Sequence, residues 1–158
     1  MSPLPPAAAR VKTAADAIGL GVEISLMPDS TRTAQEAAAA CGCAVAQIVK
    51  SLIFRGKDSG KPYLFLVSGT NRVNETGVGG LIGEALARPD AAYVREITGF
   101  AIGGIPPFGH ATTIRTLIDQ DLLQYGTVWA AAGTPNAVFA VDPRRLSAAL
   151  GAEVIRVT

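Results

Sequence analysis

The sequence predicts a single α+β domain in which a small mixed sheet curls toward a barrel and helices pack outside it. The length of 158 residues suits one domain with one core. Segments with helical spacing and segments with strand-like alternation occur in the same chain. In the second half the expected strands outnumber the helices and follow one another through short turns, which argues against a Rossmann-type sheet. We expect one domain over residues 1–158, with residues 1–6 as a flexible N-terminal tail.

The first third of the chain predicts two helices and a strand. Residues 6–19 carry apolar side chains near helical spacing, and residues 22–26 alternate between apolar and polar. Thr33 followed by Glu36 fits a capping box, and the alanine-rich run after it continues to Cys41. A second helix should therefore begin after Thr33 and end before Gly42.

The middle of the chain predicts a hairpin between helical segments. A short helical turn over 44–47 leads into a strand over Ile48–Arg55. The polar turn Gly56–Pro62 joins it to a strand over Tyr63–Val67. Asn74–Ala87 reads as a helix with an asparagine cap, although its four glycines weaken it.

The second half predicts short strands between two capped helices. Asp90 caps a helix that ends at Gly99, and Asp142 with Pro143 begins another that ends at Gly151. The expected strands lie near residues 113–118, 127–132, 137–141 and 154–157.

Composition and charge exclude several classes of protein. Apolar residues make up 49% of the chain and charged residues 17%, as in a folded globular domain. The formal net charge of +1 provides no strong basic field, so we expect no DNA partner, although a short contact with an RNA end stays open. No apolar run approaches the roughly 20 residues of a membrane span, and no signal peptide is evident. We expect a cytoplasmic protein without a membrane partner.

The few cysteine and histidine residues exclude familiar metal and nucleophile chemistry. Cys41 and Cys43 flank Gly42, and the chain's one histidine is His110, which is a poor ligand set for zinc. Neither a Gly-x-Ser-x-Gly elbow nor a phosphate-binding P-loop pattern occurs. We therefore expect no metal and no organic cofactor.

A glycine- and proline-rich loop is the most informative segment. Gly103–His110 holds three glycines and two prolines in eight residues, which neither a helix nor a central strand accommodates. Such a loop can bring bare peptide N–H groups close to a ligand. A tight connection without chemistry is the alternative interpretation.

A lysine lies inside an apolar strand. Lys50 stands in the run Ile48–Phe54, both faces of which are mostly apolar. A buried ammonium needs a partner or an opening to water. Lys50 could face an anionic ligand such as a phosphate, or it could extend to solvent or pair with a carboxylate.

A third segment consists of small residues. Ala130–Asn136 combines a small-residue strand end with a turn. These residues could pack under a helix or form a hairpin. Together with Lys50 and the glycine loop they could instead supply the floor of a pocket, a cation and a wall of hydrogen-bond donors.

Five segments resemble the YbaK-like, prolyl-tRNA-synthetase-associated editing domains. They are Val49–Leu52, Thr98–Gly109, Ile118-Asp119, Ala132-Gly133 and, in the same order along the chain, the helix Thr33–Gly42. The resemblance extends from about residue 10 to residue 157. It implies a twisted, mixed, six-stranded barrel-like sheet surrounded by helices. It also implies removal of a wrongly attached amino acid from tRNA.

The resemblance also implies which residues form the site. The family lysine corresponds to Lys50 and the glycine loop to Gly103, Gly104 and Gly109, which we predict to be catalytic. The residues that we predict to bind substrate are Arg32, Ser51, Ile105, Pro107, Phe108, His110, Ala132 and Gly133.

A mechanism follows as a hypothesis. Backbone N–H groups of the glycine loop, with that of Gly133, would stabilise the oxygen of a tetrahedral ester intermediate, each donor being worth about 2.7–4 kcal/mol. Lys50 would hold the terminal phosphate or orient the ribose. Because no strong base is evident, the ribose 2′-hydroxyl or the substrate's side chain would assist. His110 is the one neutral-pH base, and its role stays open.

The expected function is a free-standing deacylase of mischarged tRNA that carries a small amino acid. The cysteine-removing branch of the family carries a serine and an acid where this chain has Ala131 and Val138, and alanine, cysteine, serine, threonine and other small residues all stay open. The expected partner is the acceptor end of aminoacyl-tRNA, on tRNA-Pro or a related tRNA, with a synthetase as a second candidate. A catalytically silent binding module and a small-molecule ester hydrolase are the alternatives.

Overall fold

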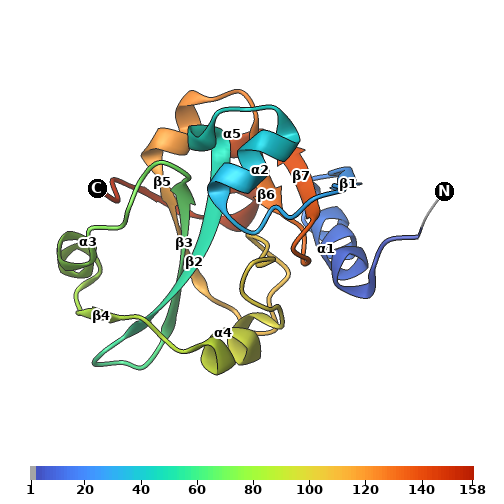
Figure 1. Cartoon of the computed structure of the whole chain (residues 1–158). Coiled ribbons are helices and arrows are strands. Elements are labelled where there is room, and N and C mark those ends of the chain that lie inside the picture. Colours follow the sequence, from blue (N-terminus) through green and yellow to red (C-terminus); the bar gives the residue numbers. More distant parts are fainter. Residues whose placement is uncertain (1–2) are drawn as a thin grey trace.

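A computed structural model describes residues 3–158 as one mixed sheet with helices around it (Figure 1). The helices are α1 (Pro6–Ala17), α2 (Ala34–Cys41), α3 (Glu75–Ile82), α4 (Ala91–Thr98) and α5 (Pro143–Leu150), with short 3-10 turns η1 (Val45–Gln47) and η2 (Gln120–Gln124). The strands are β1 (Ile24–Leu26), β2 (Ile48–Gly56), β3 (Pro62–Ser68), β4 (Leu86–Ala87), β5 (Arg115–Asp119), β6 (Val128–Ala131), β7 (Ala137–Val141) and β8 (Glu153–Ile155). No helix within the described residues is long and apolar enough to cross a membrane.

The sheet confirms the predicted mixed α+β class. Its strand order is β1-β7-β6-β2-β3-β5-β8, and β4 pairs with β2 outside this path. The β2–β6, β3–β5 and β5–β8 pairs are parallel, and the others are antiparallel. The sheet has eight strands where the family resemblance implied six, and it stays open between β1 and β8.

The predicted helix caps are present. The Thr33 hydroxyl accepts a hydrogen bond from the Glu36 N–H at 3.1 Å, and the Glu36 carboxylate accepts from the Thr33 N–H at 3.2 Å. Asp90 and Asp142 cap α4 and α5 with their side chains, which accept hydrogen bonds from the N–H groups of Tyr93 and Arg144. These local signals fix where the helices begin.

The helix predicted over Asn74–Ala87 is too long. Asn74 caps α3 as expected, but the helix ends at Ile82 because Gly83 adopts the left-handed conformation with φ of 92°. The chain then reverses, and Leu86–Ala87 pair as β4 with the end of β2. Glu84 fixes this reversal by accepting hydrogen bonds from the N–H groups of Asp58 and Ser59.

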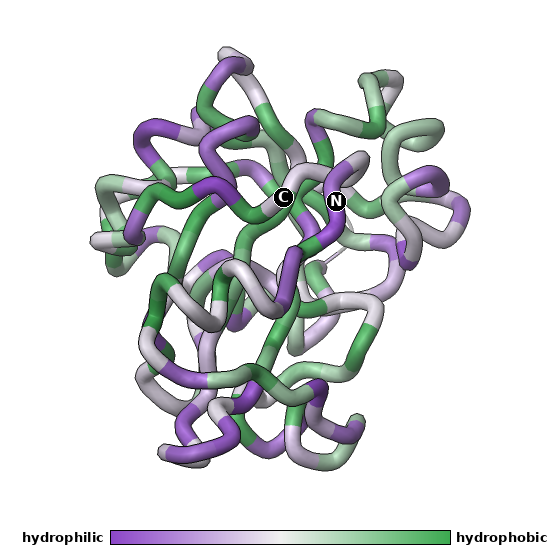
Figure 2. Tube along the Cα trace, turned by 90° about the vertical axis from the view of Figure 1, so that its left-hand side faces the viewer, coloured by the Kyte–Doolittle hydropathy of each residue, from purple (hydrophilic) through white to green (hydrophobic). Residues whose placement is uncertain are grey.

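The apolar side chains form a core on each face of the central strands, and the hydropathy trace shows the apolar residues gathered along them (Figure 2). The larger core contains Val49 and Ile53 of β2 and includes side chains of α1, α4 and α5. The smaller one contains Phe54 and lies under α3. Alternation along β2 therefore places Ser51 on the side of the larger core and Lys50 on the side of the smaller one.

The start of the chain reaches the larger core. Residues 1–2 of the predicted tail lie outside the described residues. In the part that follows, Leu4 packs against the core and Pro6 already begins α1.

The central strand β2 lacks a second neighbour over half its length. Along one edge it pairs with β3 from Val49 to Arg55. Along the other edge, β6 pairs only with Ile48–Val49 and β4 only with Arg55–Gly56. Within residues 3–158, no strand pairs with the second edge of 50–54. The sheet is therefore split at this point.

Alanine substitutions at two glycines with different surroundings test how tightly the fold is packed around each of them. Gly133 has φ of 95°, and a Cβ there would lie 2.8 Å from the Ala7 carbonyl oxygen, whereas Gly80 is exposed in α3 with open space around it. We expect Gly133→Ala to lower the free energy of unfolding by about 1–3 kcal/mol. Gly80→Ala should raise it by about 0.5–1 kcal/mol, because alanine is the better helix former. Urea unfolding of both variants measures this, and equal effects would contradict the packing described for Gly133.

Candidate functional site

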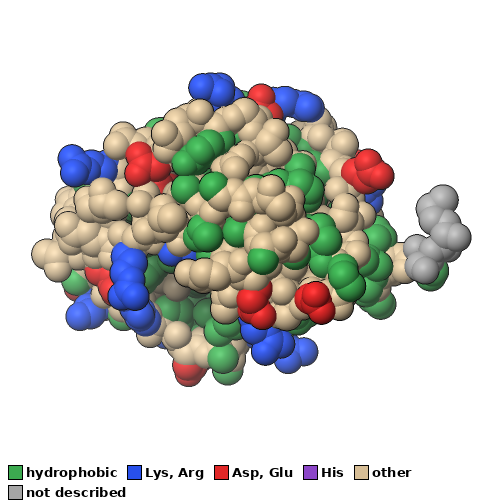
Figure 3. Space-filling view, turned by 45° about the horizontal axis from the view of Figure 1, so that its top comes forward, with side chains coloured by type: hydrophobic (Ala, Val, Ile, Leu, Met, Phe, Trp, Pro, Cys, Tyr) green, Lys and Arg blue, Asp and Glu red, His purple; other side chains and the backbone are tan. Residues whose placement is uncertain are grey.

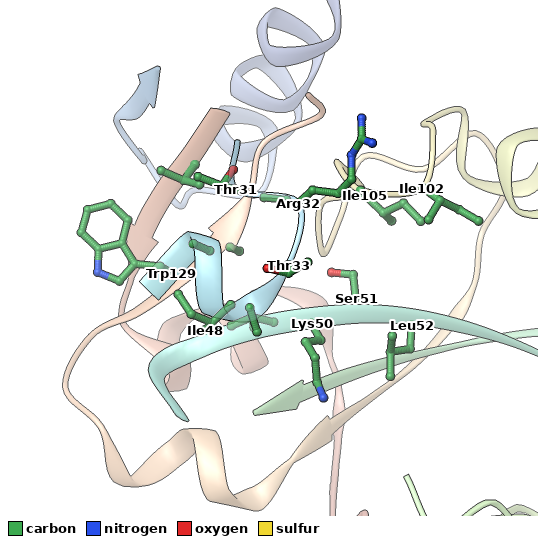
Figure 4. Close-up of a pocket in the computed structure, with 17 residues that line it drawn as sticks. Thr31, Arg32, Thr33, Ile48, Lys50, Ser51, Leu52, Ile102, Ile105 and Trp129 are labelled. Atoms are coloured by element: carbon green, nitrogen blue, oxygen red, sulfur yellow. The ribbon is translucent and has the colours of Figure 1, made fainter. Parts of the chain in front are cut away.

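A small pocket lies at the split in the sheet, between the start of α2 and the glycine-rich loop (Figure 4). Its volume is about 260 Å³. The lining residues are Thr31, Arg32, Thr33, Ala34, Ala37, Ile48, Val49, Lys50, Ser51, Leu52, Ile102, Gly103, Ile105, Trp129, Ala130, Ala131 and Val138. Most of these side chains are small or apolar, so the pocket suits a small group.

Ser51 presents a hydroxyl to this pocket. Its side chain points from β2 toward Thr33 and Arg32 (Figure 4). Its Oγ is buried and has no hydrogen-bond partner within residues 3–158. A buried polar atom without a partner is uncommon in folded proteins, which marks this side of the pocket as the place for a polar ligand group.

Lys50 lies beside the pocket, but its side chain extends to the other side of β2 (Figure 4). The Nζ atom donates a hydrogen bond to the Asn71 carbonyl oxygen. Burial lowers the pKa of Lys50 below its ordinary value, and the neighbouring Arg72 lowers it further, while Asp119 acts in the opposite direction. The ammonium is therefore partly desolvated and faces another cation.

A buried carboxylate holds the turn that receives Lys50. Asp119 accepts hydrogen bonds from the Ser68 N–H at 3.0 Å and from Asn71 Nδ2 at 2.9 Å. Asn71 Nδ2 also donates to Asp121 at 2.8 Å. These contacts fix the position of the Asn71 carbonyl and, through it, the lysine. Asp119 belongs to the family-like Ile118-Asp119 pair, whereas no sequence signal pointed to Asn71.

A second, larger hollow adjoins the first. It has a volume of about 650 Å³ and shares part of its wall with the small pocket, including Lys50, Ser51 and Ile102. Arg72 and Arg88 also line it, and no acidic side chain does so within the described part of the chain. Ile102 is 58% exposed at the boundary between the two hollows. The pair of hollows thus combines a small apolar end with a larger cationic end.

The glycine loop meets the pocket at Gly103 and Ile105. Gly103 has φ of 100°, and a Cβ there would lie 2.8 Å from Arg32 Cγ. The N–H groups of Gly103 and Ile105 have no hydrogen-bond partner among residues 3–158. These are the two residues of the loop, besides Ile102, that line the pocket, and their N–H groups are unused within the described fold.

The structure places the other predicted loop amides elsewhere. The Gly104 N–H donates to the Ala101 carbonyl at 3.2 Å, and the Gly133 N–H donates to the Gly104 carbonyl at 2.8 Å. A Cβ at Gly104 would lie 2.8 Å from the Thr134 backbone nitrogen. Gly104 and Gly133 are therefore needed for close backbone packing, and their amides are already used.

The end of the loop lies against α1 and β7, away from the pocket. A Cβ at Gly109 would lie 2.8 Å from Ala14 Cβ of α1, and Phe108 packs against Phe139 with ring centroids 5.5 Å apart. His110 Nε2 lies 2.7 Å from the Pro106 carbonyl oxygen. The predicted site residues that do not line the small pocket are Gly104, Pro107, Phe108, Gly109, His110, Ala132 and Gly133.

The small pocket holds little titratable chemistry. Its ionisable lining residues are Arg32 and Lys50, and no Asp, Glu, His or Cys lines it in the described chain. No group of three metal-ligating side chains occurs within residues 3–158. The arrangement can bind, orient and polarise a ligand, but it offers no carboxylate, imidazole or thiol as a base.

Sequence reasoning missed part of the wall. Ala34 and Ala37 lie one helical turn apart on α2 and face the pocket, and Trp129 and Val138 line it from β6 and β7. The spacing of the two alanines was a usable signal. The contribution of Trp129 depends on how the strands are ordered, which no local pattern contains, whereas the family resemblance had already singled out Val138 together with Ala131.

One face of the molecule carries mixed charge. In the face shown in Figure 3, Lys and Arg side chains are interspersed with Asp and Glu side chains. This agrees with the formal net charge of +1 and favours a short contact with a charged partner over a long one.

The chain is similar in sequence and in structure to proteins connected with the charging of tRNA and its correction. Residues 28–149 match the family model of the aminoacyl-tRNA editing domain. A crystal structure of a protein described as a candidate trans-editing enzyme for prolyl tRNA synthetase is 48% identical, with a TM-score of 0.93 over 99% of both chains. The uncharacterized protein YwhH of Bacillus subtilis (strain 168) is 29% identical over 79% of each chain. The proline–tRNA ligase of Limosilactobacillus fermentum is 33% identical over 65% of this chain, which corresponds to 19% of that ligase.

The partly buried His110 predicts a pH effect on stability. Burial lowers the pKa of His110, although its hydrogen bond to Pro106 acts in the opposite direction. The unfolded chain, with an ordinary pKa of about 6.5, therefore binds a proton more readily than the folded chain. Stability should be lost as the pH falls from 6.5 through the lowered pKa. In urea unfolding between pH 7.5 and 5, wild type should lose more stability than His110→Gln, and parallel profiles would contradict this.

Proposed function

Because this chain belongs to the aminoacyl-tRNA editing domain family, we propose that it is a trans-acting deacylase that hydrolyses the ester of tRNA charged with a wrong, small amino acid. The observation that carries the proposal is the joined pair of hollows at the split in the sheet, one small and apolar, the other larger and cationic. The relative described as a candidate trans-editing enzyme, which matches over nearly its whole length, supports the free-standing form. The acceptor end of tRNA-Pro, or of a related tRNA, is the proposed partner.

The small pocket would receive the amino acid. Ala37, Ala130 and Ala131 supply small walls, and Val138 and Ile48 supply apolar ones. A volume of about 260 Å³ lies below the roughly 300–1,000 Å³ of pockets for drug-sized ligands. Bulky side chains would be excluded sterically. Such a sieve is useful because a synthetase pocket discriminates by only about 1–3 kcal/mol per methylene.

The amides of Gly103 and Ile105 would stabilise the transition state. Both line the small pocket and lack internal partners in the described chain. As water attacks the ester carbonyl, the carbonyl oxygen gains negative charge, and a positioned N–H group stabilises that charge by about 2.7–4 kcal/mol. The rigid contact of Gly104 with the Gly133 turn would hold these donors in place.

The proton of the attacking water would leave through the substrate. The new bond joins the water oxygen to the carbonyl carbon, the bond from that carbon to the ribose oxygen breaks, and the ribose oxygen ends as a hydroxyl. No carboxylate, imidazole or thiol lines the small pocket within the described residues, and the Lys50 side chain extends to the other side of β2, so the neighbouring ribose 2′-hydroxyl would relay the proton. His110 would stabilise the loop and take no part in this step.

The larger hollow would receive the terminal nucleotide. Lys50, Arg72 and Arg88 line it and supply cations for the phosphate, while Ile102 offers an apolar surface at the boundary. Charge-assisted hydrogen bonds to phosphate are among the stronger polar contacts. Release of Lys50 from the Asn71 carbonyl, or a shared contact, would let it reach the ligand.

A panel of charged tRNAs tests the proposal through Lys50. We expect wild type to deacylate one or more of the tRNAs that carry alanine, cysteine, serine, threonine or a small non-protein amino acid. Lys50→Ala should lower kcat/KM for the best substrate by about 10- to 100-fold, because a charge-assisted contact is lost. Lys61→Ala is the matched control, since Lys61 is exposed at the far end of the β2–β3 hairpin and should keep full activity.

The same assays distinguish the two alternative functions, a catalytically silent binding module and a small-molecule ester hydrolase. Retained tRNA binding without deacylation of any substrate would favour a silent binding module. Equal turnover of simple amino acid esters would favour a small-molecule hydrolase. Unchanged turnover in Lys50→Ala would contradict the role of the lysine alone.

Filling the small pocket should change which amino acids are removed. Ala131→Leu adds side-chain volume to the pocket, so we expect loss of activity to increase with the size of the amino acid, with alanine least affected. Ala140→Leu is the control, because Ala140 is partly exposed on β7 and does not line the pocket. The same loss for all amino acids, or none, would contradict the placement of the amino acid against Ala131.

A further inference from the structure

One buried polar atom in the small pocket has no role in the fold. Ser51 Oγ is buried without a hydrogen-bond partner within residues 3–158. The two neighbouring hydroxyls each have a partner in the fold, since Thr31 donates to the Pro135 carbonyl at 3.0 Å and Thr33 accepts from the Glu36 N–H at 3.1 Å. A hydroxyl left unpaired on a central strand lowers stability, and alanine would avoid that cost. The residue is therefore better explained by a bound ligand than by folding.

The strand keeps this hydroxyl in place. Val49 and Ile53, two positions to either side of Ser51, are buried in the larger core. Alternation then obliges Ser51 to face the same way, toward Thr33 and Arg32 (Figure 4). The backbone of β2 is paired with β3 throughout this stretch, so the hydroxyl stands on a rigid support.

Hydrogen-bonding capacity indicates which substrate group it would meet. On the glycine loop, the N–H groups of Gly103 and Ile105 have no partner among residues 3–158, and as donors they suit the ester carbonyl oxygen. The α-amine, on the carbon next to that carbonyl, needs an acceptor. No carboxylate lines the pocket in the described chain, whereas Ser51 Oγ can accept two hydrogen bonds.

We propose that the Ser51 hydroxyl accepts a hydrogen bond from the α-amine of the aminoacyl group and so positions the ester against the Gly103 and Ile105 amides. This inference rests on the proposed function and makes Ser51 a determinant of specificity for a free α-amine. The apolar remainder of the pocket would then surround only the amino acid side chain.

A substrate pair that differs only in the α-amine tests the inference. Wild type and Ser51→Ala are assayed on the same tRNA charged with alanine or with propionic acid. We expect Ser51→Ala to lower kcat/KM about 10-fold for the alanyl ester, as expected for one lost hydrogen bond, and less than about 2-fold for the propionyl ester. If another amino acid is the best substrate, its desamino acid replaces propionic acid.

Stability supplies a second readout. Because Ser51 Oγ has no partner in the fold, the Tm of Ser51→Ala should equal or exceed that of wild type. A clear fall in Tm would assign the hydroxyl to the fold and overturn the inference. Ser51→Cys, of similar shape but a weak acceptor, should behave like the alanine variant in the kinetic assay.

The remaining outcomes separate the inference from the proposed function. If Ser51→Ala lowers kcat/KM equally for the two esters, Ser51 contacts the ester group or the ribose and not the α-amine. That result would overturn the inference and leave the proposed deacylase function intact. Unchanged activity for both esters would overturn it as well. A folded wild type that deacylates no charged tRNA would overturn the proposed function and, with it, the inference.

Discussion

The site depends on the missing strand neighbour along residues 50–54 of β2, which pair with β3 on one edge and with no strand of the described chain on the other. A central strand normally has its backbone groups paired on both edges. Here β6 and β4 each cover only two residues, and the stretch 50–54 between them faces the glycine loop across open space. The two hollows therefore lie inside the sheet rather than at its end, and a single strand supplies residues to both. The side chains at 50 and 51 reach opposite sides of that strand because successive residues alternate.

The glycine loop works through its packing as much as through its amides. Gly104 and Gly133 bring two backbone segments into direct contact, and α1 closes over them at Ala7 and Ala14. Arg10 of α1 adds a hydrogen bond of 2.8 Å to the Gly99 carbonyl. The glycine loop is thus fixed by α1 and by the Gly133 turn. Preorganised donors are the more effective in catalysis because they need not reorganise as charge develops.

Local signals were sufficient to predict most elements, and they failed where the outcome depended on distant contacts. The capping box at Thr33 and the apolar run of β2 involve residues close in sequence. The end of α3 was missed, because Gly83 and the pairing of Leu86–Ala87 with β2 override helical spacing. At the site, the family resemblance named Lys50, Ser51 and Gly103, and all three line the small pocket. The position of His110 could not be predicted locally, since it depends on the carbonyl of Pro106 and on partial burial.

In the proposed reaction, one side of β2 would bind the phosphate and the other side would bind the aminoacyl ester. On one side, Asp119 fixes Asn71, and Asn71 receives Lys50, so a cation is kept beside the larger hollow without entering the small pocket. On the other side, no carboxylate or imidazole lines the pocket among the described residues, so an ester placed there would meet main-chain amides, hydroxyls, the Arg32 cation and apolar walls. In the proposed reaction the substrate would then relay the proton, the loop amides would stabilise the developing charge, and the size of the pocket would select among amino acid side chains. A site of this kind can accept change in its walls without loss of its chemistry, because the donors belong to the backbone and the walls belong to side chains.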